Sequence, residues 1–178
     1  MALGLGPTTP ALAGVFFLIM QDLTCPIDGA QRRGDVVRFG DTVMVHIAGG
    51  CLCGKVRYNG DADPLFTGVC HCCNCQKVGG SAFSVWVAVP GPALSVQGEL
   101  KTYEHKGDSG KPVYHCFCPE CGSTVIDETE AERGVLVILA GTLDDPTWVK
   151  PTMEMYCDSA QPWVSLSGEW QRFPKMPR

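Results

Sequence analysis

The hydrophobic positions of this chain fall in short runs separated by turn residues, a pattern that predicts strands rather than long helices. From Gly49 onward each β-prone run is bounded by Gly, Pro, Asp or Ser. The predicted strands cover residues 55–58, 84–89, 101–104, 113–117, 124–126 and 135–140. Only residues 127–133 and 75–78 have the composition of a helical turn. The pattern therefore predicts a mainly β, antiparallel domain with few short helices.

Two of the predicted strands differ in how they would be buried. Residues 84–89 alternate, with one face apolar throughout, so one side of this strand should face the core. Residues 135–140 are apolar without a break, which is typical of a strand buried on both faces. Such strands would hold the loops rigidly, and we expect the loops to contain the chemistry.

Residues 1–47 contain no recognisable motif, and we predict an N-terminal extension of unknown role, followed by one domain over residues 48–178. The apolar stretch 11–20 has no Lys or Arg before it and is too short to span a bilayer. A buried strand or short helix is therefore favoured over a signal peptide.

The composition limits the possible partners. The chain has 178 residues and a formal net charge of −5, so a nucleic-acid partner is not expected, and no membrane association is expected either. Glycine and proline are abundant, at 21 and 13 residues, which favours short strands and turns.

The chain contains 11 cysteines, and seven of them lie in three short motifs. Cys118 and Cys121 form a Cys-x-x-Cys-Gly knuckle, whose glycine permits a tight bend. Cys51 and Cys53 are two residues apart, so both thiols reach the same side of an extended segment. Together these four thiols can form a four-sulfur zinc site.

The remaining motif contains Cys70, Cys72 and Cys75, and no equally good fourth ligand accompanies it. Three protein ligands leave one coordination position open, which is the usual feature of a catalytic zinc. A disulfide framework is disfavoured, because the cysteine count is odd and the chain is long for such a fold. Thiols kept for metal favour a reducing compartment, and we predict a cytoplasmic protein.

The other cysteines have simpler interpretations. Cys25, Cys116 and Cys157 are isolated and read as small buried apolar residues. Cys73 lies inside the candidate catalytic loop, where it could be a spare ligand, a redox partner or a small side chain. Either Cys73 or Cys116 could replace one of the predicted ligands.

Four segments, residues 49–58, 70–77, 80–83 and 117–122, together resemble the family of glutathione-dependent formaldehyde-activating enzymes and centromere protein V. The resemblance extends over about residues 48–175. It implies a β-tent fold with two zinc ions per chain, one structural and one catalytic that could be labile. It assigns the structural ion to Cys51, Cys53, Cys118 and Cys121, and the catalytic ion to Cys70, Cys72 and Cys75.

The resemblance also implies a carbon-sulfur lyase that joins a small thiol, glutathione, to a small electrophile such as formaldehyde, giving S-(hydroxymethyl)glutathione. Gly79, Gly80 and Ser81 would let the backbone approach the thiol substrate closely. The oligomeric state stays open, with a homodimer as one option.

Two other functions remain open from the sequence. One is a biosynthetic lyase or cyclase that acts on a larger metabolite, which a pocket lined by Phe83, Trp86 or Trp148 would favour. The other is a non-catalytic zinc-stabilised binding module, which a fourth protein ligand at the second metal would favour.

Several other polar residues are expected to have ordinary structural roles. His71 should point away from its neighbouring ligands, and His115 should pack or face solvent. Arg57 and Lys77 are expected to be surface charges, and the Leu-Asp-Asp-Pro segment at 143–146 is expected to be a turn.

Overall fold

A computed structural model describes residues 36–39 and 42–177, all of which belong to one unit, residues 32–178. The apolar stretch 11–20 and Cys25 lie outside the described residues. The predicted domain boundary between residues 47 and 48 falls within one strand, β2, which runs from Thr42 to Gly50.

The smaller of the two sheets has four antiparallel strands in the order β1-β2-β3-β6. Its strands are β1 (Val36–Phe39), β2 (Thr42–Gly50), β3 (Arg57–Ala62) and β6 (Leu94–Gln97). The connection from β2 to β3 contains Cys51 and Cys53, so this sheet presents one of the two predicted knuckles.

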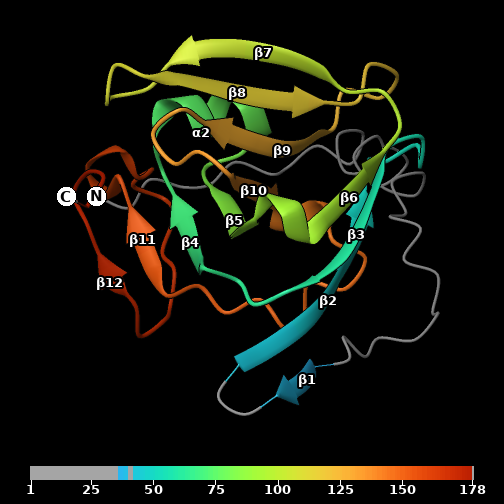
Figure 1. Cartoon of the computed structure of the whole chain (residues 1–178). Coiled ribbons are helices and arrows are strands. Elements are labelled where there is room, and N and C mark those ends of the chain that lie inside the picture. Colours follow the sequence, from blue (N-terminus) through green and yellow to red (C-terminus); the bar gives the residue numbers. More distant parts are fainter. Residues whose placement is uncertain (1–35, 40–41, 178) are drawn as a thin grey trace, which may run out of the picture. The chain divides into compact units, whose positions relative to one another are not determined.

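The larger sheet has eight strands in the order β12-β11-β4-β5-β10-β9-β8-β7. The strands are β4 (Phe66–Cys70), β5 (Ser84–Pro90), β7 (Lys101–Lys106), β8 (Pro112–Phe117), β9 (Thr124–Thr129), β10 (Val135–Leu139), β11 (Met153–Met155) and β12 (Gln171–Arg172). Figure 1 shows β7, β8 and β9 along the top of the view and β4, β11 and β12 on its left. All neighbouring pairs are antiparallel except those of β11, which is parallel to both β4 and β12.

Helical structure is sparse in the described residues. It consists of α2 (Cys73–Gly79) and three short 3-10 turns, at Gly91–Ala93, Ala140–Thr142 and Cys157–Ser159. The prediction of a mainly β fold with few short helices is confirmed. The predicted helical turn at 75–78 is part of α2, whereas that at 127–133 is wrong, because β9 continues to Thr129 and a turn follows.

The two faces of β5 contact two different hydrophobic clusters. Val87 and Val89 pack in the main core with residues of β2 and β3, while Trp86 and Ala88 pack in a smaller cluster with Met155. The strand buried on both faces is therefore β5, whereas four of the five residues of β10 are only partly buried. The sequence predicted the reverse. The position of β5 between β4 and β10, with side chains packed above and below, accounts for the difference.

No helix in the described part of the chain is long and apolar enough to cross a membrane.

Candidate metal centres and adjoining cavity

The four predicted structural cysteines meet in one cluster. The sulfur atoms of Cys51, Cys53, Cys118 and Cys121 all lie within 4.8 Å of one another, although 65 residues separate Cys53 from Cys118. Cys51 and Cys118 are buried, whereas Cys53 is exposed. The cluster therefore joins the β2–β3 connection to the β8–β9 connection near the surface.

The two knuckles of this four-cysteine cluster have similar backbone hydrogen bonds. Cys51 N–H donates to the carbonyl of Val56 at 3.0 Å, and Gly54 N–H donates back to Cys51 at 3.0 Å. In the second knuckle Gly122 N–H donates to the carbonyl of Cys118 at 2.9 Å. Gly54 and Gly122 have φ of 76° and 74°, in the left-handed region that favours glycine, which explains why a glycine follows each Cys pair.

The donor set of this cluster fits zinc. Four sulfurs at about 2.3 Å from a tetrahedral Zn²⁺ would lie about 3.8 Å from one another. The Sγ–Sγ separations of 3.5 Å for Cys51–Cys53 and 3.7 Å for Cys53–Cys118 are close to this value. Hydrogen bonds from Ser123 lower the pKa of Cys121 to about 5, which favours the thiolate form that binds metal.

The three predicted catalytic cysteines form a second cluster where β4 ends and α2 begins. Cys70 is the last residue of β4, Cys72 is the N-cap of α2, and Cys75 lies in its first turn. Their sulfurs lie within 4.8 Å of one another, and no fourth His, Cys, Asp or Glu joins them among the described residues. The sulfur of Cys72 accepts a hydrogen bond from the Cys75 N–H at 3.3 Å.

The electrostatics of this three-cysteine cluster favour one thiolate. Hydrogen bonds from the Cys70 and Cys75 thiols lower the pKa of Cys72 to about 2, and backbone N–H groups of α2 add to this effect. The pKa of Cys70 is raised, because the negative charge is concentrated on its neighbour and the thiol is largely buried. One thiolate with two thiols beside it is a suitable starting state for binding a cation.

A buried hydrogen-bonding network holds the backbone of this loop. His71 is 1% exposed, and its Nε2 lies 2.9 Å from Oε1 of Glu154 on β11. The other carboxylate oxygen accepts from Trp170 Nε1 at 2.8 Å and from Arg172 Nε at 2.9 Å. The imidazole of His71 is directed to Glu154, as expected for a residue that points away from its neighbouring ligands.

The helix that follows the loop is fixed by one glutamine. Gln76 Nε2 donates to the carbonyl oxygens of His71 at 2.6 Å and Ser159 at 2.9 Å, and its Oε1 accepts from Gln161 at 2.7 Å. The loop is thus held from residues more than 80 positions later in the chain. Such support orients ligands around a metal.

Tyr156 was not singled out from the sequence, although it packs against the same cluster. It is the one non-glycine residue with positive φ, at 56°, in the described part of the chain. A strained backbone of this kind persists only where the surrounding structure stabilises it, and it is common at functional sites.

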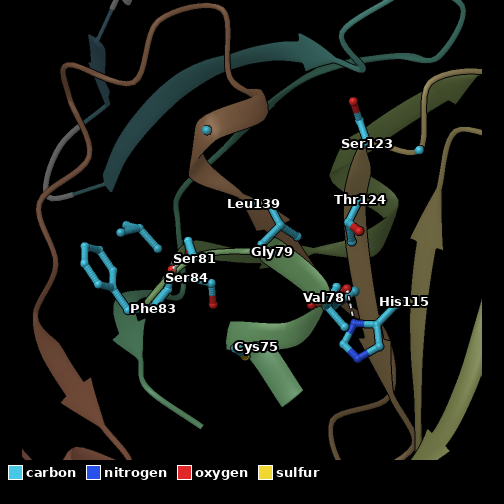
Figure 2. Close-up of a pocket in the computed structure, with 14 residues that line it drawn as sticks. Cys75, Val78, Gly79, Ser81, Phe83, Ser84, His115, Ser123, Thr124 and Leu139 are labelled. Carbon is cyan, nitrogen blue, oxygen red and sulfur yellow. Dashed lines mark hydrogen bonds and ion pairs between the residues drawn. The ribbon is translucent and has the colours of Figure 1, made fainter. Parts of the chain in front are cut away.

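A cavity of about 430 Å³ opens beside the three-cysteine cluster, and Cys75 forms part of its wall. Its other lining residues are Val78, Gly79, Ser81, Phe83, Ser84, Val85, His115, Gly122, Ser123, Thr124, Asp127, Leu139 and Gly141. Figure 2 shows Phe83, Ser81 and Ser84 on one side, His115 and Thr124 on the other, and Cys75 below. Its size suits a small-molecule ligand.

The predicted substrate-binding residues differ in where they lie. Gly79 and Ser81 line the cavity. Gly80 is absent from the lining, and instead it ends α2 in the left-handed conformation, with its N–H donating to the carbonyl of Gln76. Ser84 also lines the cavity, and its hydroxyl is buried.

Two cysteines that could have replaced ligands lie outside both clusters. Cys73 is exposed on α2, and Cys116 is buried on β8 with its sulfur 3.6 Å from the Thr102 hydroxyl. Cys157 is only partly buried.

Of the aromatic residues predicted for a roomier pocket, only Phe83 lines the cavity. Trp86 packs edge-on against Phe66, and Trp148 packs against the main core. Arg57 makes a two-pronged ion pair with Asp144, and Lys77 is exposed.

His115 and Asp127 are lining residues that sequence reasoning missed. They are directly opposite one another on β8 and β9, and His115 Nδ1 lies 2.7 Å from Asp127 Oδ1. His115 lies in a predicted strand, but Asp127 lies one residue beyond the predicted strand 124–126, in the segment 127–133 predicted as a helical turn, so no signal in the sequence pointed to this pair. His115 is 4% exposed, which agrees with the expectation that it packs.

The comparison with protein families matches residues 46–159 to the family described as "Glutathione-dependent formaldehyde-activating enzyme", so the chain belongs to this family. A curated protein of Emericella nidulans, named "Putative glutathione-dependent formaldehyde-activating enzyme", is 34% identical over 83 residues. The matched region is 47% of this chain and 42% of that protein, so the chain spans less than half the length of this relative.

Among solved structures, the crystal structure of a Rhodobacter sphaeroides protein is similar to this chain, with 21% identity and a TM-score of 0.45. The similarity covers 58% of this chain and 91% of the other.

Proposed function

We propose that this protein is a carbon-sulfur lyase that joins glutathione to formaldehyde, giving S-(hydroxymethyl)glutathione, and that it uses zinc at Cys70, Cys72 and Cys75. The observation that supports the proposal most strongly is that three cysteine sulfurs within 4.8 Å of one another adjoin a cavity of about 430 Å³. Family membership agrees with this chemistry.

In the proposal the two clusters have different roles. Cys51, Cys53, Cys118 and Cys121 hold a structural ion, because four protein sulfurs complete a tetrahedral coordination sphere. A Zn²⁺ ion at the second cluster would favour the thiolate form of a substrate thiol or polarise a carbonyl oxygen. The position left open by the protein is where a substrate atom would bind.

The chain's own residues position the substrate around that place. Gly79 and Ser81 line the cavity, where the Ser81 hydroxyl donates to the carbonyl of Phe83 and can still accept a hydrogen bond from a ligand. Phe83 adds an apolar wall that helps to exclude water. The Glu154–His71 contact keeps the cysteine loop in place while substrate enters.

The two alternative functions gain less support. A larger metabolite was expected for a roomier pocket lined by Phe83, Trp86 or Trp148; Phe83 lines the cavity, whereas Trp86 and Trp148 pack elsewhere. A purely structural second metal was expected to have a fourth protein ligand such as Cys73, and the three-cysteine group has no such member among the described residues.

The test is two-dimensional exchange NMR of glutathione and formaldehyde at equilibrium, with zinc per chain measured on the same samples. The wild type should accelerate exchange and contain two zinc ions per chain, while Cys72→Ser should lose the acceleration and one ion. Cys73→Ser is the matched control, because it is exposed on the same helix and outside the cluster, and it should behave as the wild type.

Two outcomes would count against the proposal in different ways. A zinc-loaded wild type without acceleration would refute the reaction and leave the metal assignment intact. Full activity and two zinc ions in Cys72→Ser would refute the assignment of Cys72 as a ligand.

A further inference from the structure

Three side chains form a continuous hydrogen-bonded row from the cavity to the edge of the larger sheet. Asp127 Oδ1 lies 2.7 Å from His115 Nδ1, and His115 Nε2 lies 2.9 Å from His105 Nε2. The two imidazole rings are stacked, with centroids 5.0 Å apart. The row ends at His105 Nδ1, which lies 3.0 Å from the carbonyl oxygen of Lys106.

The register of the strands produces this row. His115 on β8 is directly opposite Asp127 on β9 and Tyr103 on β7, so these side chains share one face of the sheet. His105 is two residues beyond Tyr103 and is therefore on the same face. Asp127 and His115 line the cavity, whereas His105 is partly exposed on the edge strand β7.

The number of protons in the row follows from its hydrogen bonds. A carboxylate and a carbonyl oxygen can only accept, and both ends of the row are such acceptors. Three hydrogen bonds link the four ring nitrogens to each other and to these ends, so they require three protons. Two neutral imidazoles supply only two. The row must therefore hold one additional proton, either on a ring as imidazolium or on Asp127 as a carboxylic acid.

The surroundings favour retention of that proton. The hydrogen bond to Asp127 is the largest cause of a raised pKa of His115, against the opposing effect of burial. Besides the members of the row themselves, the titratable groups that face it are Tyr103 on β7, and Cys72 and Cys75 at α2.

We propose that Asp127, His115 and His105 form a proton relay that supplies a proton from solvent at β7 to the oxygen of an electrophile bound beside Cys75. This inference rests on the proposed carbonyl chemistry, since addition of a thiolate to formaldehyde produces an alkoxide that must be protonated. His115 and His105 are positioning residues in this scheme, and Asp127 is the member that meets the bound molecule.

The relay step balances as follows. The thiolate sulfur forms a bond to the carbonyl carbon, and the π electrons of the C=O bond move to oxygen, which takes the additional proton of the row. For delivery, the additional proton is on Asp127 Oδ2, facing the alkoxide, while Asp127 Oδ1 accepts from His115 Nδ1–H and His115 Nε2 accepts from His105 Nε2–H. After the transfer Asp127 is a carboxylate and these two hydrogen bonds are unchanged. Solvent restores the missing proton at His105 Nδ1, and the proton released by the entering thiol leaves to solvent.

The first arm of the test counts protons without using activity. Nitrogen-15 NMR of the histidine side chains, with carbon-13 NMR of the Asp127 carboxyl group, in the zinc-loaded full chain should show one imidazolium, one proton shared between His115 and His105, or a protonated Asp127 at pH 7. A finding of two singly protonated rings together with an ionised Asp127 at pH 7 overturns the proposal, whatever the activity.

The second arm compares His105→Gln with His46→Gln in the exchange measurement across pH. A glutamine can accept from a charged His115 or donate to a neutral one, so the additional proton is no longer required. The exchange rate constant at saturating substrate should fall about 100-fold, with KM and zinc content unchanged, and its alkaline decline should move to lower pH. His46→Gln removes an exposed histidine that is also paired with an aspartate, Asp61. This control should change neither the exchange rate constant nor the pH of its alkaline decline.

The outcomes separate this proposal from the proposed function. An active wild type with an unchanged pH profile in His105→Gln overturns the relay and leaves the proposed function standing. A wild type that accelerates no exchange overturns the proposed function and the relay's role in it, while the proton count is decided by the NMR arm alone.

Discussion

The two cysteine clusters have the same donor atoms but differ in what surrounds them. The four-cysteine cluster is built from two tight knuckles that satisfy their own backbone hydrogen bonds, and one of its thiols, Cys53, is exposed. The three-cysteine cluster has local hydrogen bonds at the start of α2, and it is also held by distant contacts of its loop with Glu154 and Met155 and by the Gln76 side chain. Of the two clusters, only the second has a cysteine in the cavity wall.

The difference corresponds to two proposed roles: the four-cysteine cluster holds the fold together, whereas the three-cysteine cluster presents an open metal position. A knuckle that satisfies its own backbone hydrogen bonds needs no support from the rest of the protein. A pair of such knuckles stabilises the fold by joining two hairpins through one metal ion. A site that must keep one position open cannot rely on a fourth ligand for rigidity, so its geometry has to come from surrounding residues.

The largest expected effect distinguishes the two clusters by stability. Cys118→Ser removes a buried ligand of the four-cysteine cluster and should lower the free energy of unfolding by about 4 kcal/mol or more, as for loss of a metal. Cys72→Ser should lower the free energy of unfolding by much less, because the hydrogen bond between His71 and Glu154 still holds the surrounding loop. Urea unfolding of the zinc-loaded proteins measures both. Cys116→Ala is the control for removing a nearby buried thiol and should cost about 1 kcal/mol.

If Cys72→Ser destabilised the protein as much as Cys118→Ser, the division into a structural and a reactive cluster would be wrong.

Metal removal should proceed in two steps. A chelator should take the ion from the three-cysteine cluster first, because three protein ligands hold it rather than four. Exchange activity should therefore disappear while the far-ultraviolet circular dichroism is unchanged, and loss of the second ion should then unfold the protein. The measurement is a chelator titration with activity, circular dichroism and released zinc followed together. Simultaneous loss of both ions would contradict the comparison.

Glu154→Gln should weaken only the three-cysteine cluster. The change removes a buried carboxylate that accepts from His71, Trp170 and Arg172, and it should cost about 2 kcal/mol of stability at pH 7. Zinc at this cluster should bind about 10- to 100-fold more weakly. Thermal unfolding and a zinc competition titration measure the two effects, and zinc binding at the four-cysteine cluster is the internal control.

The same variant has a defined pH dependence. Burial opposes the charge of Glu154, but hydrogen bonds from Trp170 and His71 outweigh it and lower the pKa in the fold. The ionised group therefore contributes stability above the pKa of an unfolded glutamate, about 4.3, and this contribution is lost as pH falls through the lower folded value. The stability difference between wild type and Glu154→Gln should shrink across that acid range. A difference that stays constant down to pH 2 would contradict this account.

The smallest expected effects come from three glycines with positive φ. Alanine at Gly54, Gly122 or Gly80 meets no atom within 4 Å, so the cost is that of the left-handed backbone alone, about 1 kcal/mol each. Asparagine at the same positions should cost less, since it tolerates this conformation better. Thermal unfolding compares the two series, and an alanine cost near zero at all three positions would contradict the assigned turns.

The sequence was sufficient to group the cysteines, because ligand spacing is a local property. The runs of apolar residues between turn residues also located six strands. The ends of the predicted strands differ by a few residues from the ends of the observed ones, which are β3, β5, β7, β8, β9 and β10. The short strand β11, with three residues, and its parallel pairing to β4 gave no signal, since parallel pairing depends on tertiary contacts. Strands β1 and β2 lie in or overlap the segment that contained no motif.

The surroundings of the site could not be read from the sequence for a physical reason. Partners such as His71 and Glu154 are 83 residues apart, and nothing in the local pattern around either residue identifies the other. The row from Asp127 to His105 depends on strand register, which a hairpin signal gives only within one or two residues, and a shift by one residue would place these side chains on opposite faces.

The long separation between His71 and Glu154 also sets an order of events during synthesis. The four cysteines of the first cluster are all available once Cys121 has left the ribosome, whereas the supports of the second cluster come later, at Glu154, Ser159 and Gln161. At about 5–20 residues per second the interval is a few seconds. For that time the three thiols beside α2 have no fixed partners. The newly made chain therefore passes through a stage in which its most reactive sulfurs are the least protected against oxidation or a wrong metal ion.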